Sequence, residues 1–259
     1  MLKILDWNIS YLNNAISKTE LLQSIVEGDS FIIVLQEVTP PQFDVIKEAF
    51  PNIKYSLDYR KPGKYDTRQR KLGIAIIASN DISIENAGVL DRCILPDRTL
   101  LADLRYNNEQ LSVLGLHSVT GVSHRKAKSI QFLSFAECID EYKPDIVAFD
   151  ANEPKKDHYA IEEMEFFDNG DNGKGARTFF ETLFNCGLHD AYVANYDNSR
   201  YVEGEPLVIS HKLSRGNHSR RYDFVFVNDR MKIEQINYKY DEAIIAGSDH
   251  ALIEMCVGL

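Results

Sequence analysis

Residues 247–255 read GSDHALIEM and pose the central question of this sequence. Residues 251–255 have the apolar character of a buried strand, yet Ser248, Asp249 and His250 stand directly before them. Taken alone, the segment is explained by a polar turn with a solvated histidine. Other strand-like segments of the chain also meet polar side chains at one end, and together they favour a functional site.

Six short apolar segments share this feature. Four of them end with polar residues, namely LKILDWN (Asn8), FIIVLQE (Glu37), LSVLGLH (His117) and DIVAFDAN (Asp150 and Asn152). Two begin with them, YDFVFV with Asp223 and SDHALIEM with Asp249 and His250. In an antiparallel pair the end of one strand lies beside the start of its neighbour. We therefore expect the polar groups of all six segments to meet at one edge of the sheet structure.

The residue types in this set indicate metal-assisted acid–base chemistry. The carboxylates of Glu37 and Asp249 and the amide oxygen of Asn8 suit a hard divalent cation such as Mg²⁺. The absence of cysteine from the set and of a histidine pair at ligand spacing argues against zinc. An imidazole beside a carboxylate, with a further acid to orient it, suits a general base that acts on water.

The apolar pattern predicts a mixed fold. Runs bounded by Gly, Pro, Asn or Asp predict strands at residues 2–9, 31–35, 72–79, 99–106, 111–116, 145–149, 222–227, 231–240 and 251–257. Helical periodicity predicts helices at residues 18–27, 41–50, 124–141 and 176–186. Helices separate some of these strands, but only turns separate others. We therefore expect an α+β fold or a sheet sandwich flanked by helices, not a doubly wound parallel sheet.

Composition sets broad limits on the class of protein. At 259 residues, of which 44% are hydrophobic, the chain can form one large domain or two small ones. No apolar run approaches the roughly 20 residues of a membrane span, and the N-terminus lacks the apolar segment of a signal peptide. The four cysteines are scattered and are expected to be reduced thiols. These features predict a cytoplasmic protein without a membrane partner.

The cations of the chain are concentrated in three segments, although the net charge is −10. Residues 59–72, 117–128 and 212–222 together hold 13 Lys and Arg side chains and a single acid. They are either solvated loops or, if they meet in space, an anion-binding surface. The second interpretation predicts five side chains that contact substrate: Arg68, Arg70, Lys71, Arg125 and Arg221.

The ordered set WN, LQE, LHS, DAN, YDF and SDH resembles the endonuclease/exonuclease/phosphatase superfamily, which includes deoxyribonuclease I-like enzymes. The resemblance spans residues 7–250 and implies a single catalytic domain over residues 1–259. It implies a four-layer α/β-sandwich of two packed sheets flanked by helices, with the site at one sheet edge. The sequence departs from the family at Phe149, where glycine is usual, and at Ser10, where abasic endonucleases often have an acid.

The resemblance also implies roles for individual residues. It makes His250 the general base, Asp223 the carboxylate that orients it, and Asp150 and Asn152 the pair that positions water and phosphate. The implied reaction is the in-line attack of water on a phosphorus atom.

The same resemblance implies that three further residues hold the metal ion. Glu37, Asn8 and Asp249 would hold Mg²⁺, with Mn²⁺ as the alternative ion. His117 matches a second histidine that would stabilise the transition state together with Asn8 and Asn152.

The three basic segments adjoin motif positions, and this arrangement favours a polyanionic substrate. The sequence therefore predicts a nuclease that acts on DNA or RNA, with no obligate protein partner evident. A phosphatase or phospholipase acting on inositol phosphates or sphingolipids is the alternative enzyme. A catalytically inactive binding module on the same fold is the alternative of a different class.

Overall fold

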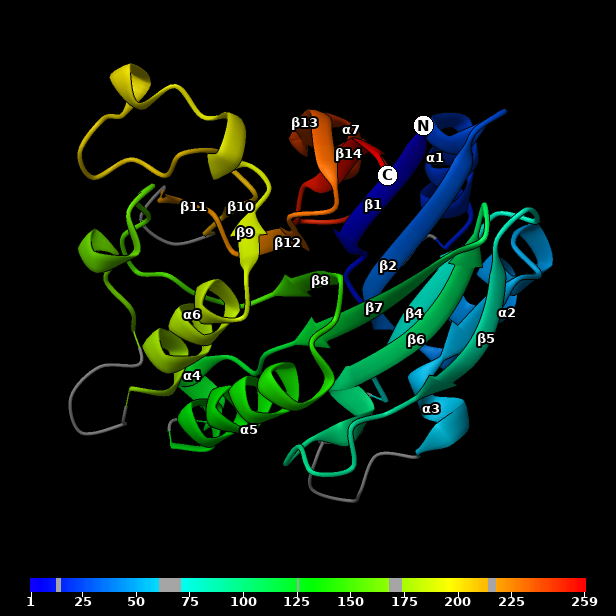
Figure 1. The fold of residues 1–259 in the computed structure, drawn as a ribbon, viewed down its shortest axis with the longest axis horizontal. Coiled ribbons are helices and arrows are strands. Elements are labelled where there is room, and N and C mark those ends of the chain that lie inside the picture. Colours follow the sequence, from blue (N-terminus) through cyan, green and yellow to red (C-terminus); the bar gives the residue numbers. More distant parts are fainter. Residues whose placement is uncertain (13–14, 61–70, 125, 168–173, 214–217) are drawn as a thin grey trace.

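The computed structural model describes residues 1–12, 15–60, 71–124, 126–167, 174–213 and 218–259. Two six-stranded sheets pack face to face, and helices cover their outer faces (Figure 1). The predicted α+β sandwich of four layers is therefore confirmed. None of the helices in the described ranges has the length and apolar character needed to cross a membrane.

The first sheet contains the strands near both ends of the chain. Its order is β13-β14-β1-β2-β4-β3, and only the β1–β2 pair is parallel. In that order the strands are Lys232–Lys239, Leu252–Gly258, Leu2–Asn8, Ser30–Val38, Gly73–Ala78 and Ile53–Tyr55.

The second sheet has the order β5-β6-β7-β8-β12-β9, and only the β7–β8 pair is parallel. Its strands are Ser83–Gly88, Thr99–Tyr106, Glu109–His117, Ile146–Asp150, Asp223–Asn228 and Leu188–Asp190. A separate two-stranded hairpin pairs β10 (His211–Lys212) with β11 (Ser219–Arg220).

Each predicted strand and helix overlaps an observed one. The long helices are α1 (Ala15–Val26), α2 (Pro40–Ala49), α5 (Lys126–Tyr142) and α6 (Gly175–Asn185), and the short ones are α3 (Ser56–Tyr59), α4 (Gly121–His124) and α7 (Tyr240–Ile245). The strands missed by the sequence analysis are β3, β5, β9, β10 and β11. Most of these are only two or three residues long, which is too short for an alternating pattern to show.

Three apolar clusters separate the four layers. One fills the space between the sheets and includes Ile4, Val34 and Val113. The second lies between the first sheet and helices α1 and α2. The third lies between the second sheet and helices α5 and α6, where phenylalanines such as Phe149 and Phe179 stack edge to face.

Alternation along the strands explains why the space between the sheets ends in polar groups. In β1, Leu2 and Ile4 face the inter-sheet core, so the same face continues with Asp6 and Asn8. The inward faces of β2, β7 and β8 likewise end with Gln36, His117 and Asp150. Each inner surface changes from apolar to polar at the same edge of the sandwich.

The close approach of the two sheets depends on Gly115 in β7. A Cβ atom at this position would lie 2.7 Å from Ile74 Cγ2 and 2.8 Å from Val34 Cγ1, both in the opposite sheet. Gly115→Ala should therefore lower the free energy of unfolding by about 1–3 kcal/mol through overpacking, measured by urea denaturation.

Gly88→Ala in β5 is the matched control, because a Cβ atom there meets nothing within 4 Å. Its free energy of unfolding should stay within about 0.5 kcal/mol of the wild type. Equal stabilities of the two variants would contradict the role given to Gly115.

Candidate active site

Strand register brings the polar ends of three strands side by side in the second sheet. His117 of β7 pairs with Asp150 of β8, and Asp150 pairs with Asp223 of β12. In the first sheet, Asn8 of β1 lies beside Gln36 of β2. The two rows face each other across the end of the inter-sheet core, where β1 contacts both β8 and β12.

His250 reaches this edge from the turn that precedes β14. Its Nδ1 lies 2.9 Å and 3.0 Å from the two carboxylate oxygens of Asp223. Its backbone carbonyl accepts a hydrogen bond of 3.0 Å from Trp7 Nε1, which fixes the residue against β1. Ser248 Oγ donates to the carbonyl of Asn8 and accepts from the amide of His250. The polar start of this strand therefore ties the imidazole to both sheets.

The charges around His250 set the protonation of the site. Burial lowers the pKa of His250, but the carboxylates of Asp223 and Asp150 more than offset this effect and raise it to about 10. Burial raises the pKa of the Asp150 carboxyl to about 7, and repulsion from Asp223 adds to the shift although the charge of His250 opposes it. The carboxylates of Asp223 and Asp150 therefore favour the charged form of His250.

His117 is held as a neutral imidazole. Arg98, at the end of a short 3₁₀ turn (Pro96–Arg98), has its Nη1 2.8 Å from His117 Nδ1. The same Nη1 lies 3.3 Å from His117 Nε2. Because arginine only donates, the shorter contact makes Nδ1 the acceptor and leaves the proton of the neutral ring on Nε2. Burial lowers the pKa of His117 well below its usual value, and the charges of Arg98 and His250 lower it further. Gln131 of α5 donates to the carbonyl of His117 and fixes the end of β7.

Asp150 and Asn152 form a tight turn after β8. The backbone amide of Asn152 donates to Asp150 Oδ1 at 2.8 Å, and Asn152 adopts a positive φ of 49°. Asn8 Nδ2 donates to Asp150 Oδ2 at 2.9 Å from the opposite sheet. Lys128 of α5, itself paired with the buried Glu153, donates to the carbonyl of Asn152. The carboxylate of Asp150 is thus oriented by donors from both sheets.

Glu37 enters the site through a strained position in β2. Its φ is 58°, where the register of β2 with β4 shifts, so the side chain turns toward the site. Glu37 Oε2 accepts from the amide of Tyr11 at 3.2 Å, and Oε1 lies 3.6 Å from His117 Nε2. Lys18 of α1 and Gln42 of α2 both donate to the carbonyl of Ser10, which holds the loop after β1 in place.

The donor set fits a hard divalent cation. Oxygens of Glu37 and Asp150 lie 3.6 Å and 3.7 Å from the same atom, His117 Nε2, so both carboxylates face one small region. Carboxylate oxygens are the ligands that Mg²⁺ prefers, together with water and phosphate. Asn8 directs its amide nitrogen to Asp150 and its oxygen to the amide of Ser10. The expected ligation by Asn8 and Asp249 stays a prediction.

Buried residues behind the site escaped the sequence analysis. Asp6 is fully buried and accepts a hydrogen bond from Gln36 Nε2. Burial raises its pKa well above the ordinary value, although the bond from Gln36 opposes the shift. Arg98 and His211 were also missed. The alternating pattern of β1 could have identified Asp6, since it stands on the apolar face, but nothing in the sequence marks Arg98 or His211.

Of the five side chains predicted to contact substrate, only Lys71 and Arg221 lie within the described residues. Lys71 is exposed at the start of β4, whereas Arg68, Arg70 and Arg125 lie outside the described residues. The prediction for Arg221 is wrong, because this side chain is 1% exposed and points into the protein. Arg221 Nη2 lies 2.5 Å from Asp190, and its guanidinium stacks 4.4 Å from the ring centre of Phe224.

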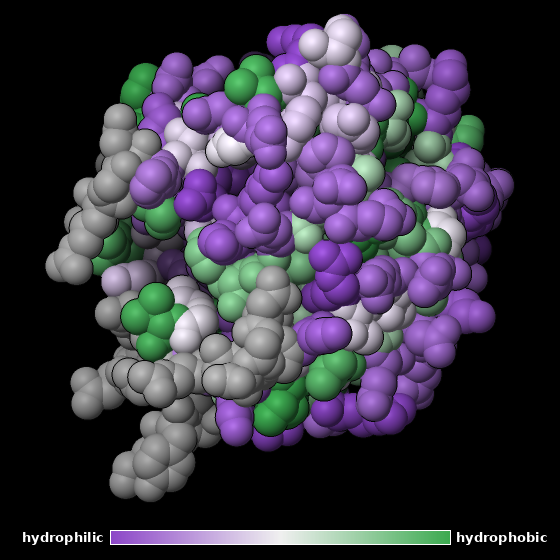
Figure 2. Space-filling view, turned by 90° about the vertical axis from the view of Figure 1, so that its left-hand side faces the viewer, coloured by the Kyte–Doolittle hydropathy of each residue, from purple (hydrophilic) through white to green (hydrophobic). Residues whose placement is uncertain are grey.

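A cavity of about 540 Å³ adjoins the candidate site. Its walls include Asn152, the Lys128–Glu153 ion pair, His211, Phe167 and Tyr222. Figure 2 views the molecule from the side on which Figure 1 places α6 and the β10–β11 hairpin, and this face is mostly hydrophilic with a hydrophobic area near its middle.

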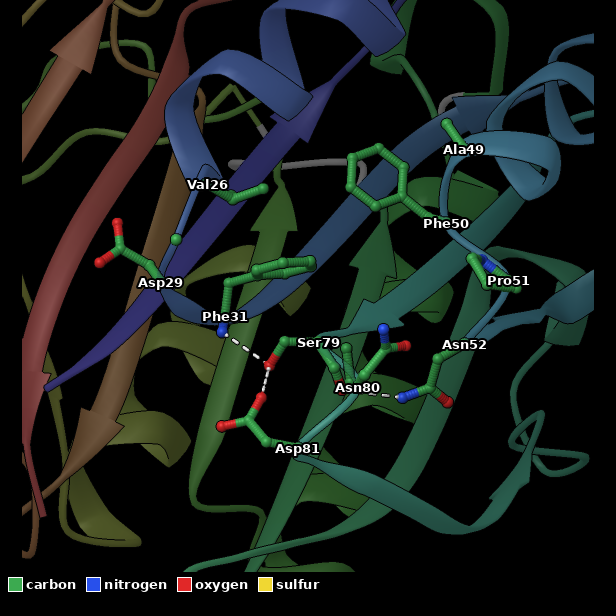
Figure 3. Close-up of a pocket in the computed structure, with 12 residues that line it drawn as sticks. Val26, Asp29, Phe31, Ala49, Phe50, Pro51, Asn52, Ser79, Asn80 and Asp81 are labelled. Carbon is green, nitrogen blue, oxygen red and sulfur yellow. Dashed lines mark hydrogen bonds between the residues drawn. The ribbon is translucent and has the colours of Figure 1, made fainter.

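A second cavity, of about 410 Å³, lies where β2 begins and β4 ends. Figure 3 shows that polar groups of its lining bond to one another: the amide of Phe31 donates to Ser79 Oγ, which donates to Asp81. The six motif segments contribute only Phe31 to this lining. The second cavity therefore lies apart from the candidate site, whereas the first borders it at Asn152 and His211.

Arg221 provides a test of the buried ion pair. Arg221→Gln should lower the free energy of unfolding by about 3–5 kcal/mol, because it leaves the carboxylates of Asp190 and Asp157 buried without their cation. The adjacent Arg220→Gln, at a half-buried position of β11, should change stability far less. Thermal and urea denaturation of both variants measure this difference. An Arg221→Gln protein of wild-type stability would contradict the stabilising role given to this buried ion pair.

Comparison with solved structures identifies the fold. A humanized D. rerio TDP2 matches with a TM-score of 0.65 at 12% identity, covering 100% of this chain and 99% of that one. A mannosyl-6-phosphatase of Bacteroides thetaiotaomicron matches with a TM-score of 0.63 at 14% identity over 100% of both chains. The endonuclease domain of TRAS1, a telomere-specific non-LTR retrotransposon, matches with 0.60 at 13% identity, covering 100% and 99%.

No family model and no curated protein matches the sequence. At these identities the structural likeness concerns the fold. An endonuclease/exonuclease/phosphatase protein of Bacteroides vulgatus, with a TM-score of 0.61 at 14% identity over 99% of this chain and 98% of that one, carries the same arrangement. The chain therefore has the endonuclease/exonuclease/phosphatase, or deoxyribonuclease I-like, fold that its ordered motifs predicted.

Proposed function

We propose that the chain is a divalent-metal-dependent phosphodiesterase that hydrolyses nucleic acid by attack of water on phosphorus. The observation that carries this proposal is the His250–Asp223 hydrogen bond, located where Asp150, Glu37 and His117 also converge. A histidine held by a carboxylate at Nδ1 presents Nε2 as a proton acceptor.

In the reaction, His250 Nε2 accepts a proton from water while the water oxygen attacks phosphorus. The bond from phosphorus to the ester oxygen of the leaving group breaks, and that oxygen takes a proton from solvent. Asp223, hydrogen-bonded to Nδ1, stabilises the imidazolium that forms. His117 carries its proton on Nε2 and donates it in a hydrogen bond to a phosphate oxygen, where negative charge accumulates. Asp150, fixed by Asn8 and Asn152, orients the attacking water.

A divalent cation, Mg²⁺ or Mn²⁺, held by Glu37 and Asp150 would polarise the phosphate and offset the carboxylate charge that raises the pKa of His250. Asn8 and Asp249 are the further ligands of this proposal. The exposed side chain of Asp249 is free of the packing that fixes Asp150, so it can adjust to an ion.

The basic hairpin beside the site supports a polynucleotide substrate. The segment 212–222 brings Lys212 and Arg220 next to His211, which forms a backbone bridge with His250. Two of the structural neighbours are named as nucleic-acid proteins, a TDP2 complexed with single-strand DNA product and an endonuclease domain. Cations beside a hydrolytic centre attract a phosphate backbone.

A small organic phosphate is the second candidate substrate. The cavity beside Asn152 has room for a group attached to one phosphate, and one neighbour is named a mannosyl-6-phosphatase. This alternative keeps the same base and the same metal ligands but needs no extended anion-binding surface.

The first test incubates the protein with supercoiled plasmid and, separately, with labelled single-stranded RNA, each with Mg²⁺, with Mn²⁺ and with EDTA. Metal-dependent cleavage of one polymer is expected, and His250→Ala should reduce the rate by about 10²–10⁴-fold, the usual contribution of a general base. His189→Ala, at an exposed histidine paired with Asp229, is the control and should cleave normally.

Cleavage by His250→Ala at the wild-type rate would exclude the assigned base. If neither polymer is cut in any metal, the nucleic-acid substrate is wrong, and sugar and inositol phosphates with release of inorganic phosphate are the next assay.

The hairpin provides a second test. Replacing Lys212 and Arg220 together by alanine should raise the KM for single-stranded substrate more than it changes kcat. Two lost phosphate contacts should also reduce the slope of log KM against log salt concentration by about 1.4. The control pair, Lys155 and Lys232, forms exposed ion pairs with Glu165 and Glu234. An unchanged salt slope in the hairpin variant would favour the small phosphate.

A further inference from the structure

His211 lies against the catalytic histidine although 39 positions separate them in the sequence. The first residue of β10, it forms an isolated antiparallel bridge with His250. The two imidazole rings are 4.4 Å apart between centres and inclined by 32°. Tyr222 stacks at 5.8 Å from the His211 ring, so the position of this imidazole is fixed on two sides.

Hydrogen bonding determines which nitrogen each ring presents. His211 Nδ1 lies 3.0 Å from the backbone carbonyl of Asp249, which only accepts, so Nδ1 carries the proton. His250 Nδ1 is bound to the carboxylate of Asp223. In neutral form, both rings therefore have their lone pair on Nε2. Metal-binding histidines in proteins have this arrangement, with the second nitrogen bonded to a carboxylate or a carbonyl.

The carboxylate of Asp249 completes a set of three ligands. One ligand atom from each of His211, Asp249 and His250 lies within 4.8 Å of the others. Tetrahedral zinc with nitrogen ligands at 2.0–2.1 Å needs ligand atoms about 3.4 Å apart. Asp249 is exposed, and a rotation of its side chain can close the remaining distance.

We propose that His211, Asp249 and His250 form a zinc-binding site that switches the enzyme off. Two imidazoles and one carboxylate select Zn²⁺ over Mg²⁺, since nitrogen ligands favour the later transition metals. Zinc bound here occupies the Nε2 lone pair of His250 and also takes Asp249. The inhibitory part rests on the proposed function, whereas the binding site stands on its geometry alone.

The binding test uses isothermal titration of the full chain with Zn²⁺ alone, after removal of metals by a chelator. Wild type should bind one Zn²⁺ per chain at this site, and His211→Gln should bind it at least about 10-fold more weakly. His189→Gln, which alters a histidine outside the cluster, should bind like the wild type. Undiminished binding by a folded His211→Gln protein, or no binding by the wild type, would overturn the site.

A second readout needs no variant. In long-range ¹H–¹⁵N spectra of the wild type, Zn²⁺ should shift the Nε2 resonances of two imidazoles together, and Mg²⁺ at the same concentration should not. A shift confined to one imidazole would contradict ligation by both His211 and His250.

The activity test measures the hydrolysis rate of each protein with Zn²⁺ relative to the rate of the same protein without Zn²⁺. Zn²⁺ in the presence of excess Mg²⁺ should suppress hydrolysis by the wild type, and His211→Gln should need at least about 10-fold more zinc for the same fractional loss. Equal zinc sensitivity of the two proteins would reject the switch. If the chain hydrolyses nothing, the proposed function fails, and titration and spectra still decide whether the zinc site exists.

Discussion

The buried hydrogen bond between His250 and Asp223 joins the two sheets, and the candidate site depends on it. His250 belongs to the turn before β14 in the first sheet, and Asp223 begins β12 in the second. Asn8 with Asp150 and Glu37 with His117 repeat the pattern, each linking one sheet to the other. Each of these three pairs is divided between the sheets, so the candidate site exists only when both sheets are packed in register.

This arrangement concentrates acidic groups in a region shielded from water. Asp6, Asp150 and Asp223 are each at most 1% exposed, and the charge of His250 opposes the effect of burial on the pKa of Asp6 and of Asp150. Such a cluster costs stability that an apolar core would provide. Donors from neighbouring elements, such as Gln36 to Asp6 and Asn8 to Asp150, limit the cost and keep each carboxylate in one orientation.

The sequence predicted the long elements and the motif positions because both depend on local patterns. Alternation along β1, β7 and β8 shows in the residues themselves, and polar side chains at their ends stand out against the apolar runs. Burial of Arg221 could not be read from neighbours, because its carboxylate partners come from distant segments. The same limit hid His211: histidine spacing argued against a zinc site, yet the β10–β11 hairpin folds one imidazole onto another. Contacts of this kind follow from tertiary packing alone.

The pairing of β1 with β14 has a kinetic consequence. Trp7 and His250 are 243 positions apart, yet their hydrogen bond is among those that hold His250 in place. Hairpins such as β6–β7 close only short loops, whereas the β1–β14 ladder closes most of the chain, and contacts of such separation slow folding. We therefore expect refolding chains to regain most sheet structure before the candidate site forms. The lag between the two events would measure the time that the β1–β14 ladder needs to close.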